Sequence, residues 1–220
     1  MHHEATIQNW ELFKTQAMKA AQVKKNIPEL LELLEADEGQ VILCPASTRK
    51  DYIGCYPGGL VEHSLRVLSC MSKLRTVYGA TNDATDTELI TVGLFHDIGK
   101  VGRPKPKPEK FHKQQWDSYY TENTSSWHRE KLGMLYEVNK DLSFICPQQL
   151  SLMLLAEHEV DLNLREWHAI ASLQPERDLN NAVAYPKDHE PFLAVLLRHA
   201  ITAVSRDTKG KHEASYMGRR

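Results

Sequence analysis

Cysteine is scarce in this chain, and the cysteines present are not paired at any motif spacing. They stand at irregular intervals, as Cys44, Cys55, Cys70 and Cys146, and no CxxC motif occurs. A disulfide framework needs a regular set of cysteines, and redox or zinc motifs need close pairs. The pattern speaks against these classes and predicts reduced thiols in a cytoplasmic protein.

Long apolar runs and a strong net charge are also absent. No apolar segment approaches the roughly 20 residues that span a bilayer, and the N-terminus lacks a signal-peptide pattern. The 29 acidic and 27 basic side chains give a formal net charge of −2. We therefore expect no membrane partner and no bulk attraction to nucleic acid. A length of 220 residues allows one substantial core and predicts one structural domain.

Apolar residues recur at helical spacing along most of the chain, which predicts an all-α fold. Gly39 and Gly99 are predicted to close the helices before them, and the polar tail from residue 209 is predicted to be flexible. After residue 102, alternating prolines exclude a regular helix. The predicted helices cover residues 6–25, 28–39, 60–68, 89–98, 127–139, 147–157, 164–172 and 191–205.

Two histidines and one aspartate stand within these helical patterns, as His63 and the adjacent pair His96 and Asp97. Imidazole nitrogens and a carboxylate oxygen together suit a divalent transition metal such as Mn, Fe, Co, Ni or Zn. Neighbouring residues on a helix diverge by about 100°, so the His-Asp pair can share one ion only near a helix end. The sequence predicts one such ion held by these three residues. The alternative is that they are hydrogen-bonded core residues.

The residues around the His-Asp pair resemble a known family. The motif is HDIGK at residues 96–100, and the upstream segment at 44–65 reads CPASTRKDYIGCYPGGLVEHSL. Together they resemble the HD superfamily of metal-dependent phosphohydrolases, and are similar to HD domains of bacterial 3′–5′ exoribonucleases, relaxase-associated proteins and small phage proteins. The resemblance covers residues 41–206.

The resemblance implies an all-α, single-domain HD-type helical bundle. We expect an N-terminal helical segment at 1–40 packed on the core, the HD domain at 41–208 and a flexible tail at 209–220. The implied activity is that of an enzyme, a phosphohydrolase acting on a nucleotide or related phosphoester small molecule. The amphipathic N-terminal helix is a candidate contact surface between chains.

Lys100 is the predicted contact to the substrate phosphate. It lies about one helical turn beyond His96, and its ammonium group would act as a point charge toward a phosphate oxygen. Asp97 and Lys100 are the predicted catalytic residues. The alternative for Lys100 is an ordinary ion pair.

Two further residues are candidate substrate contacts. Arg66 follows His63 by three residues, so it would reach the same cavity or pair with Glu62. His128 stands at the start of a predicted helix, where it would touch substrate at the cavity mouth. The alternative for His128 is to cap that helix and pack beside Trp127.

The sequence departs from the family pattern where further metal ligands are expected. HD proteins take a final aspartate from a late helix, and Ile201 stands at the position that looks equivalent. Asp207 lies about 240° net around that helix and could bind only if the helix ended early. Relatives with two metals carry histidines where this chain has Ile53 and, at 172–174, Ser-Leu-Gln. These departures predict a mononuclear site. They also leave open a degenerate HD protein that acts as a nucleotide-binding or interaction module.

The segment after HDIGK is basic and proline-rich, which predicts an extended path. Such a segment beside a metal site could bind single-stranded nucleic acid through its phosphates, while nearby aromatic rings stack on bases. A nucleic-acid-processing HD domain is therefore a second alternative, against a solvated connection. The residues concerned are Arg103, Lys105, Lys107 and Lys110, with Phe111, Trp116, Tyr119 and Tyr120 nearby.

Overall fold

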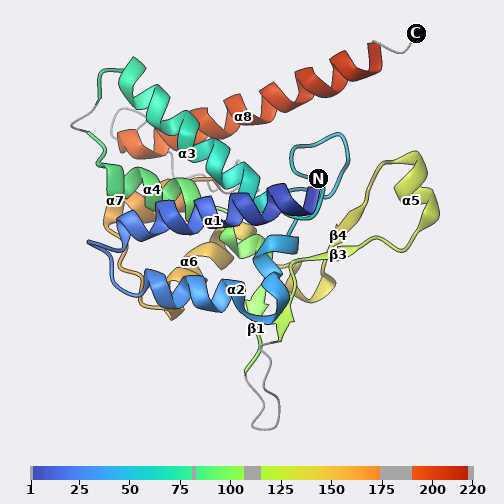
Figure 1. The fold of residues 1–220 in the computed structure, drawn as a ribbon, viewed down its shortest axis with the longest axis horizontal. Coiled ribbons are helices and arrows are strands. Elements are labelled where there is room, and N and C mark those ends of the chain that lie inside the picture. Colours follow the sequence, from blue (N-terminus) through green and yellow to red (C-terminus); the bar gives the residue numbers. More distant parts are fainter. Residues whose placement is uncertain (1, 81–82, 107–114, 174–189, 218–220) are drawn as a thin grey trace, which may run out of the picture.

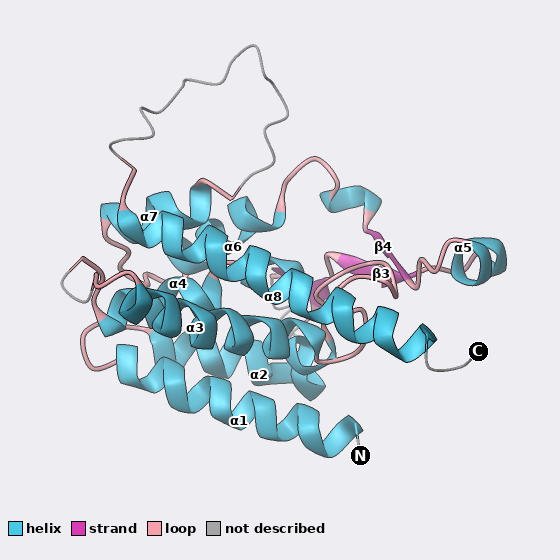
Figure 2. Cartoon of the chain, turned by 90° about the horizontal axis from the view of Figure 1, so that it is seen from above, coloured by secondary structure: helices cyan, strands magenta, loops and turns pink. Residues whose placement is uncertain are grey.

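Helices form almost the whole fold in the computed structural model. It describes residues 2–80, 83–106, 115–173 and 190–217, with the side chains of 2–3, 37–39 and 207–217 excepted. The central helices α3 and α4 have α1 and α2 on one side and α6, α7 and α8 on the other (Figures 1 and 2). The helices are α1 (His2–Ala20), α2 (Ile27–Leu43), α3 (Gly59–Val77), α4 (Asp86–Phe95), α5 (Ser126–Lys131), α6 (Pro147–Glu157), α7 (Leu164–Ala171) and α8 (Phe192–Met217).

The central helix α4 is apolar around most of its circumference and contacts α1, α3, α7 and α8. Every residue from Glu88 to Phe95 is buried, as a helix without a polar face requires. Its first turn is fixed by a capping box, in which Thr85 Oγ1 accepts the amide of Glu88 and the Glu88 carboxylate accepts the amide of Thr85. The helix is therefore anchored at its start, and its last residue precedes the His-Asp pair.

The aromatic side chains of the core pack against the end of α4. The Trp10 and Phe13 rings stack at 5.2 Å, and Phe13 meets Phe95 edge-on at 5.7 Å. All three side chains are almost fully buried. The backbone that follows Phe95 therefore starts from a rigid point.

The N-terminal helices differ from the prediction at their ends. The first was predicted to run to residue 25, but α1 ends at Ala20. Pro28 lies in the first turn of α2 as expected, because proline has no amide hydrogen to lose there. Gly39 does not close this helix, which continues to Leu43.

The predicted helix at 127–139 is wrong in its second half. Helix α5 ends at Lys131, and Gly133 then takes a φ of +63°, which favours glycine and breaks the helix. Strand β4 (Tyr136–Val138) follows and pairs antiparallel with β3 (Tyr120–Glu122). A second small sheet joins β1 (Arg103–Pro104) to β2 (Trp116–Asp117), and a 3₁₀ turn, η2 (Lys140–Leu142), precedes α6. The sequence pattern did not predict these short strands.

The later helices follow the prediction more closely. Helix α6 spans the residues predicted for it, and α7 ends one residue earlier. Helix α8 is longer than predicted and continues to Met217, where a flexible tail was expected (Figure 1). No helix in the described ranges is long and apolar enough to cross a membrane.

Candidate metal centre

The loop before α3 places His63 inside the protein. Gly58 adopts a φ of +85° and turns the chain into α3. A Cβ on Gly59 would lie 2.0 Å from the carbonyl oxygen of Gly54, so the loop packs directly on the helix start. The amide of Leu60 donates to the carbonyl of Cys44 at 3.1 Å. His63 follows one turn later and is buried.

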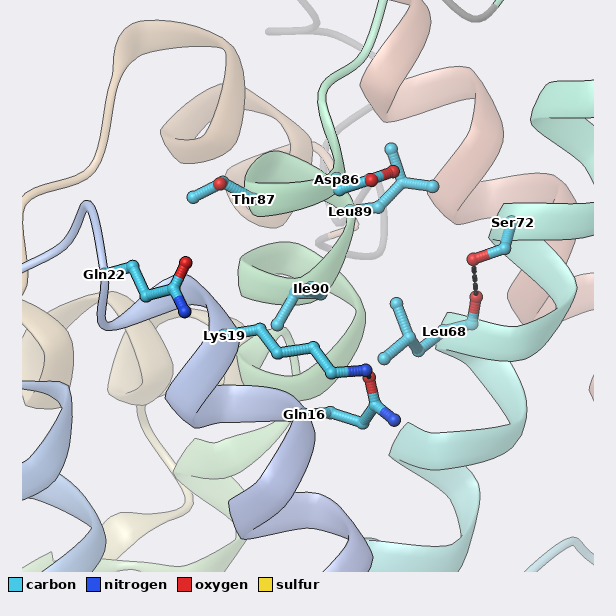
Figure 3. A pocket seen from close by; sticks show the side chains of 9 residues that line it. All are labelled: Gln16, Lys19, Gln22, Leu68, Ser72, Asp86, Thr87, Leu89 and Ile90. Atoms are coloured by element: carbon cyan, nitrogen blue, oxygen red, sulfur yellow. Dashed lines mark hydrogen bonds between the residues drawn. The ribbon is translucent and has the colours of Figure 1, made fainter.

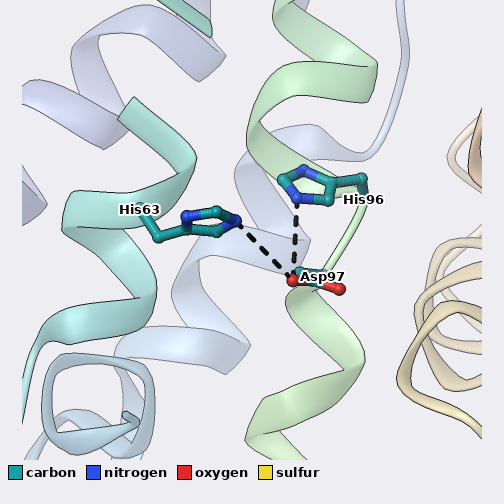
Figure 4. A group of neighbouring side chains, drawn as sticks. All are labelled: His63, His96 and Asp97. Carbon is teal, nitrogen blue, oxygen red and sulfur yellow. Dashed lines mark ion pairs between the residues drawn. The ribbon is translucent and has the colours of Figure 1, made fainter. Parts of the chain in front are cut away.

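The His-Asp pair lies where α4 ends, as the geometry of a helix requires. His96 is the C-terminal cap of α4, and Asp97, with φ −117° and ψ 10°, leaves the helical conformation. A 3₁₀ turn, η1 (Ile98–Val101), follows. This change of path turns the Asp97 carboxylate toward the imidazole of His96, and both face His63 on α3 (Figure 4).

The three side chains form a compact, buried group. Asp97 Oδ2 lies 3.9 Å from Nε2 of His63 and 3.7 Å from Nε2 of His96. One nitrogen or oxygen atom from each residue lies within 4.8 Å of the other two. The side chains are 4%, 0% and 6% exposed, respectively for His63, His96 and Asp97. Within the described residues, no further His, Cys, Asp or Glu joins this group.

Burial keeps both imidazoles neutral. It lowers the pKa of His63 to about 3, helped by the positive charge of Lys100, and burial also lowers the pKa of His96. The Gly93 carbonyl can only accept a hydrogen bond, so Nδ1 of His96, at 3.1 Å, donates to it. Nε2 of His96 then carries a lone pair and has no hydrogen-bond partner among the described residues.

That lone pair faces a carboxylate oxygen, an arrangement that a cation between them would stabilise. Burial alone raises the pKa of Asp97, but the adjacent positive charge of Lys100 outweighs it and lowers the pKa. Asp97 is therefore ionised. Two neutral imidazoles and one carboxylate, buried and convergent, match the ligand chemistry of a divalent transition metal. A carbonyl behind the imidazole, as Gly93 supplies for His96, is the usual support of a metal-binding histidine.

Lys100 lies against the same carboxylate. Its ammonium group is 2.6 Å from Oδ2 of Asp97 and 2.8 Å from the carbonyl oxygen of Ala46. Burial alone lowers the pKa of Lys100, but the adjacent Asp97 raises it above the ordinary value, so the ammonium stays charged. The structure thus places Lys100 next to His63, His96 and Asp97, where the sequence predicted it, and pairs it with Asp97.

Helix α6 contributes two residues that sequence reasoning missed. Gln148 donates from Nε2 to Oδ1 of Asp97 at 2.7 Å, and Ser151 accepts the amide of Gly99 at 2.9 Å. Gly99 was predicted to close an α-helix, but α4 already ends at Phe95. A Cβ on Gly99 would lie 2.1 Å from the Pro147 carbonyl oxygen, so the role of Gly99 is to let α6 approach η1. No local pattern marks these pairs, because about fifty residues separate the partners.

The two other candidate substrate contacts lie in different places. Arg66 pairs with Glu62 at 2.5 Å, the alternative that the sequence left open, and its charge also lowers the pKa of His63. His128 lies in α5, out on the β3–β4 arm and away from α3 and α4 in both views (Figures 1 and 2). Its backbone amide donates a hydrogen bond to Oγ of Ser125, the helix cap, and its ring centroid lies 5.4 Å from that of Trp127. The structure does not bring His128 into the metal-ligand group.

The apolar residues at the positions where relatives carry further metal ligands pack into the protein. Ile201, Ile53 and Leu173 are partly buried and pack against the main core. Helix α8 does not end before Asp207, although the side chain of Asp207 lies outside the described residues. Gln174 is also outside them. Among the described residues, three side chains are therefore able to hold a metal ion together.

A separate cavity of about 440 Å³ opens between α1, α3 and α4 (Figure 3). Its charged groups already have partners, since Lys19 donates to Gln16 at 2.9 Å and Asp86 pairs with Arg75 at 2.5 Å. No histidine or cysteine is among its lining residues, which are Gln16, Lys19, Gln22, Leu68, Ser72, Asp86, Thr87, Leu89 and Ile90. The group that could hold a metal ion, His63, His96 and Asp97, does not line this cavity.

The fold is a helical bundle in which two buried histidines and an aspartate converge at the end of a helix, a group that could hold a metal ion. The family model of the HD domain matches residues 60–173, just over half of the chain, and includes all three residues. The protein therefore belongs to the HD-domain superfamily. No curated protein and no solved structure matches the chain significantly. The match ends before α8, and the finer likeness to exoribonucleases or phage proteins stays a prediction.

Proposed function

We propose that this HD-domain protein is a metal-dependent phosphohydrolase acting on a nucleotide or a related phosphoester. One divalent transition ion (Mn, Fe, Co, Ni or Zn) would be held by His63, His96 and Asp97. The observation that carries the proposal is the buried Nε2 of His96, which has no partner in the described structure and faces an ionised carboxylate oxygen at 3.7 Å. Membership of a superfamily of metal-dependent phosphohydrolases supports it.

A bound ion of this kind polarises a phosphate oxygen and lowers the pKa of a coordinated water. The protein's own residues would prepare the site for that chemistry. His63 and His96 keep their lone pairs because burial holds them neutral. Asp97 supplies the negative charge. Lys100 has three donor hydrogens, of which Asp97 and Ala46 use two, so one remains for a phosphate oxygen.

Access to the site sets a condition on the substrate. The ligand side chains are at most 6% exposed, whereas Lys100 is 13% exposed and Arg66 is 39% exposed. A phosphate group would therefore reach the site through its more exposed rim, at Lys100. The ammonium of Lys100 would favour an anionic group there.

The first experiment measures metal content after purification without chelator or affinity metal. We expect about one transition metal ion per chain in the wild type and none in the His96→Ala/Asp97→Ala double variant. A matched control is His158→Gln, which removes a histidine outside the ligand group and should retain the ion. Circular dichroism would verify that each variant is folded.

The loaded protein would then be screened for phosphate release from nucleoside mono-, di- and triphosphates and from cyclic nucleotides. Activity in the wild type and in His158→Gln, but not in the double variant, would support the proposal. A wild type that stays empty after incubation with Mn, Co, Ni and Zn would contradict it.

A second candidate function is a degenerate HD protein that binds a nucleotide or a partner without hydrolysis. The apolar, partly buried Ile201 and the nearly closed site favour this alternative. It predicts that the ion binds and that a nucleotide binds, but that no phosphate is released with any of the four metals.

The nucleic-acid alternative rests on the basic segment after HDIGK. Two of its cations are partnered, since Arg103 pairs with Glu157 at 3.3 Å and Lys105 with Asp117 at 2.9 Å. Lys107 and Lys110 lie outside the described residues. This alternative predicts binding to single-stranded nucleic acid that weakens steeply as salt is raised, which a fluorescence titration at two salt concentrations would detect.

A further inference from the structure

Gln148 contacts Asp97 through its side-chain amide nitrogen. An amide nitrogen donates hydrogen bonds and does not bind a cation. The amide nitrogen of Gln148 donates to Oδ1 of Asp97 at 2.7 Å. The other oxygen of the same carboxylate, Oδ2, is the one that faces His63 and His96. The two oxygens of Asp97 are therefore already assigned to opposite sides. We propose that Gln148 is a positioning residue that makes Asp97 a ligand for a single ion.

The need for such a residue follows from the freedom of the aspartate side chain. Rotation about the last torsion of aspartate is soft, so the carboxylate plane is set by its hydrogen-bond donors. Lys100 alone would hold Oδ2 and leave Oδ1 free to turn. Because Gln148 holds Oδ1 and Lys100 holds Oδ2, the plane is fixed from both ends.

The donor is also neutral, and this matters for the charge of the site. Each carboxylate oxygen has two lone pairs, and Lys100 occupies one of those on Oδ2. Lys100 already balances the single negative charge of Asp97, so a second cation on Oδ1 would give the site a net positive charge that repels a metal. The amide of Gln148 orients the carboxylate without adding such a charge. It also takes one of the two lone pairs of Oδ1, so less of that oxygen is left for a second ion.

Helix α6 holds Gln148 in place through a second anchor on the same face. Ser151, three residues further along, accepts the amide of Gly99 and donates to the carbonyl of Pro147. Residues three apart on a helix are neighbours on its surface. One helix face therefore fixes both the backbone of η1 and the carboxylate of Asp97, and the absence of a side chain at Gly99 allows the close approach.

The inference rests on the proposed metal centre, and the experiment separates the two. Mn²⁺ and Zn²⁺ binding would be measured by equilibrium dialysis with metal analysis, which gives both the dissociation constant and the number of ions per chain. The test variant is Gln148→Met, which keeps the length of the side chain and removes the donor. The matched control is Gln149→Met, because the adjacent Gln149 caps the amide of Cys146 and does not contact Asp97.

We expect one ion per wild-type chain and binding about 10 to 100-fold weaker in Gln148→Met, the usual effect of removing a hydrogen bond to a metal ligand. Gln149→Met should bind within about twofold of wild type, although it loses a helix cap. A second variant, Gln148→Lys, keeps a hydrogen-bond donor at this position but adds a positive charge. We expect it to bind metal at least tenfold more weakly than wild type because the added charge repels the ion. A Gln148 that only filled space would not predict this loss.

Equal affinities in Gln148→Met and Gln149→Met would overturn the inference while leaving the metal centre intact. Two ions per wild-type chain would overturn the single-ion role of Gln148. A wild type that binds neither metal would overturn the proposed function and the inference with it. If Gln148→Met does not fold, Gln148→Asn gives the same comparison, because its amide is one methylene too short to reach Oδ1.

Discussion

Lys100 should weaken the metal site electrostatically while it stabilises the metal-free protein. Its ammonium lies 2.6 Å from Oδ2 of Asp97, and the two side chains are 13% and 6% exposed. At an effective dielectric constant of about 20, two unit charges at that separation attract by roughly 6 kcal/mol before the cost of desolvation. Removing one partner of a buried pair costs about 3 to 5 kcal/mol of stability. We expect about 3 kcal/mol for Lys100→Met, since Gln148 still holds Oδ1.

The same substitution should tighten metal binding. An ion held by Asp97 shares the carboxylate with the ammonium of Lys100, and the two positive charges repel. Without Lys100 this repulsion is gone, and we expect at least a tenfold gain in affinity, equivalent to about 1.4 kcal/mol. Phosphate release should fall at the same time, because the proposed phosphate contact is lost. Tighter binding with lower activity is a combination that general damage to the site would not produce.

The assay is urea unfolding of each protein in chelator and in excess Mn²⁺. A ligand that binds only the folded state adds RT ln(1 + [L]/Kd) to the unfolding free energy, so Mn²⁺ should stabilise Lys100→Met more than wild type. The control is Lys105→Met, which removes an ion pair whose side chains are 44% and 47% exposed. It should cost less than about 1 kcal/mol and leave the response to Mn²⁺ unchanged. The reasoning is refuted if Lys100→Met in chelator is as stable as Lys105→Met, or if Mn²⁺ stabilises it less than wild type.

Two further predictions concern the metal-free protein. Burial lowers the pKa of His63 to about 3 and also lowers that of His96, whereas an unfolded histidine titrates near 6.5. The unfolded state thus binds more protons below about pH 6.5. Stability should fall as pH falls through that window, by up to about 1.4 kcal/mol per pH unit for each histidine. Urea unfolding in chelator between pH 7 and 5 should show a smaller slope in His63→Gln than in the wild type, and an undiminished slope would contradict this prediction. Gly99→Ala should destabilise by about 3 kcal/mol, because its Cβ would meet the Pro147 carbonyl at 2.1 Å. Gly79→Ala has open space and should cost about 1 kcal/mol, from its φ of +66° alone. Equal losses in the two glycine variants would show that α6 does not pack as described.

The convergence of the three candidate ligands could be predicted because it depends on local rules. Neighbouring residues on a helix diverge, so a His-Asp pair that shares an ion must lie at a helix end, and the structure has His96 there. Helix α6 could be predicted for a similar reason, since Pro147 can only open a helix and a continuous apolar pattern follows it.

The missed features depend on pairs that are distant in sequence. Residues 127–139 have apolar residues at helical spacing, but Leu135 donates its amide to Thr48 and the chain pairs with β3 instead. The contact between Gln148 and Asp97 spans 51 residues and leaves no periodic signal. Local patterns therefore give the ligands, while the residues that orient the ligands come only from the packed structure.

The hydrogen bond at Nδ1 of each histidine also predicts how much that histidine contributes to metal affinity. His96 is held by the Gly93 carbonyl at Nδ1, whereas Nδ1 of the buried His63 has no hydrogen-bond partner among the described residues. If His63 held an ion through Nε2, its Nδ1 hydrogen would stay unpaired, and this cost would reduce the contribution of His63 to the affinity.

We therefore expect His63→Gln to weaken Mn²⁺ binding less than His96→Gln does, by about tenfold against about a hundredfold. Both substitutions remove one imidazole from a buried position, so each serves as the volume control for the other. Equilibrium dialysis with metal analysis gives the two dissociation constants under identical conditions. A larger loss for His63→Gln would mean that the support behind an imidazole does not govern its strength as a ligand here. The metal centre would then depend mainly on the number of its ligands.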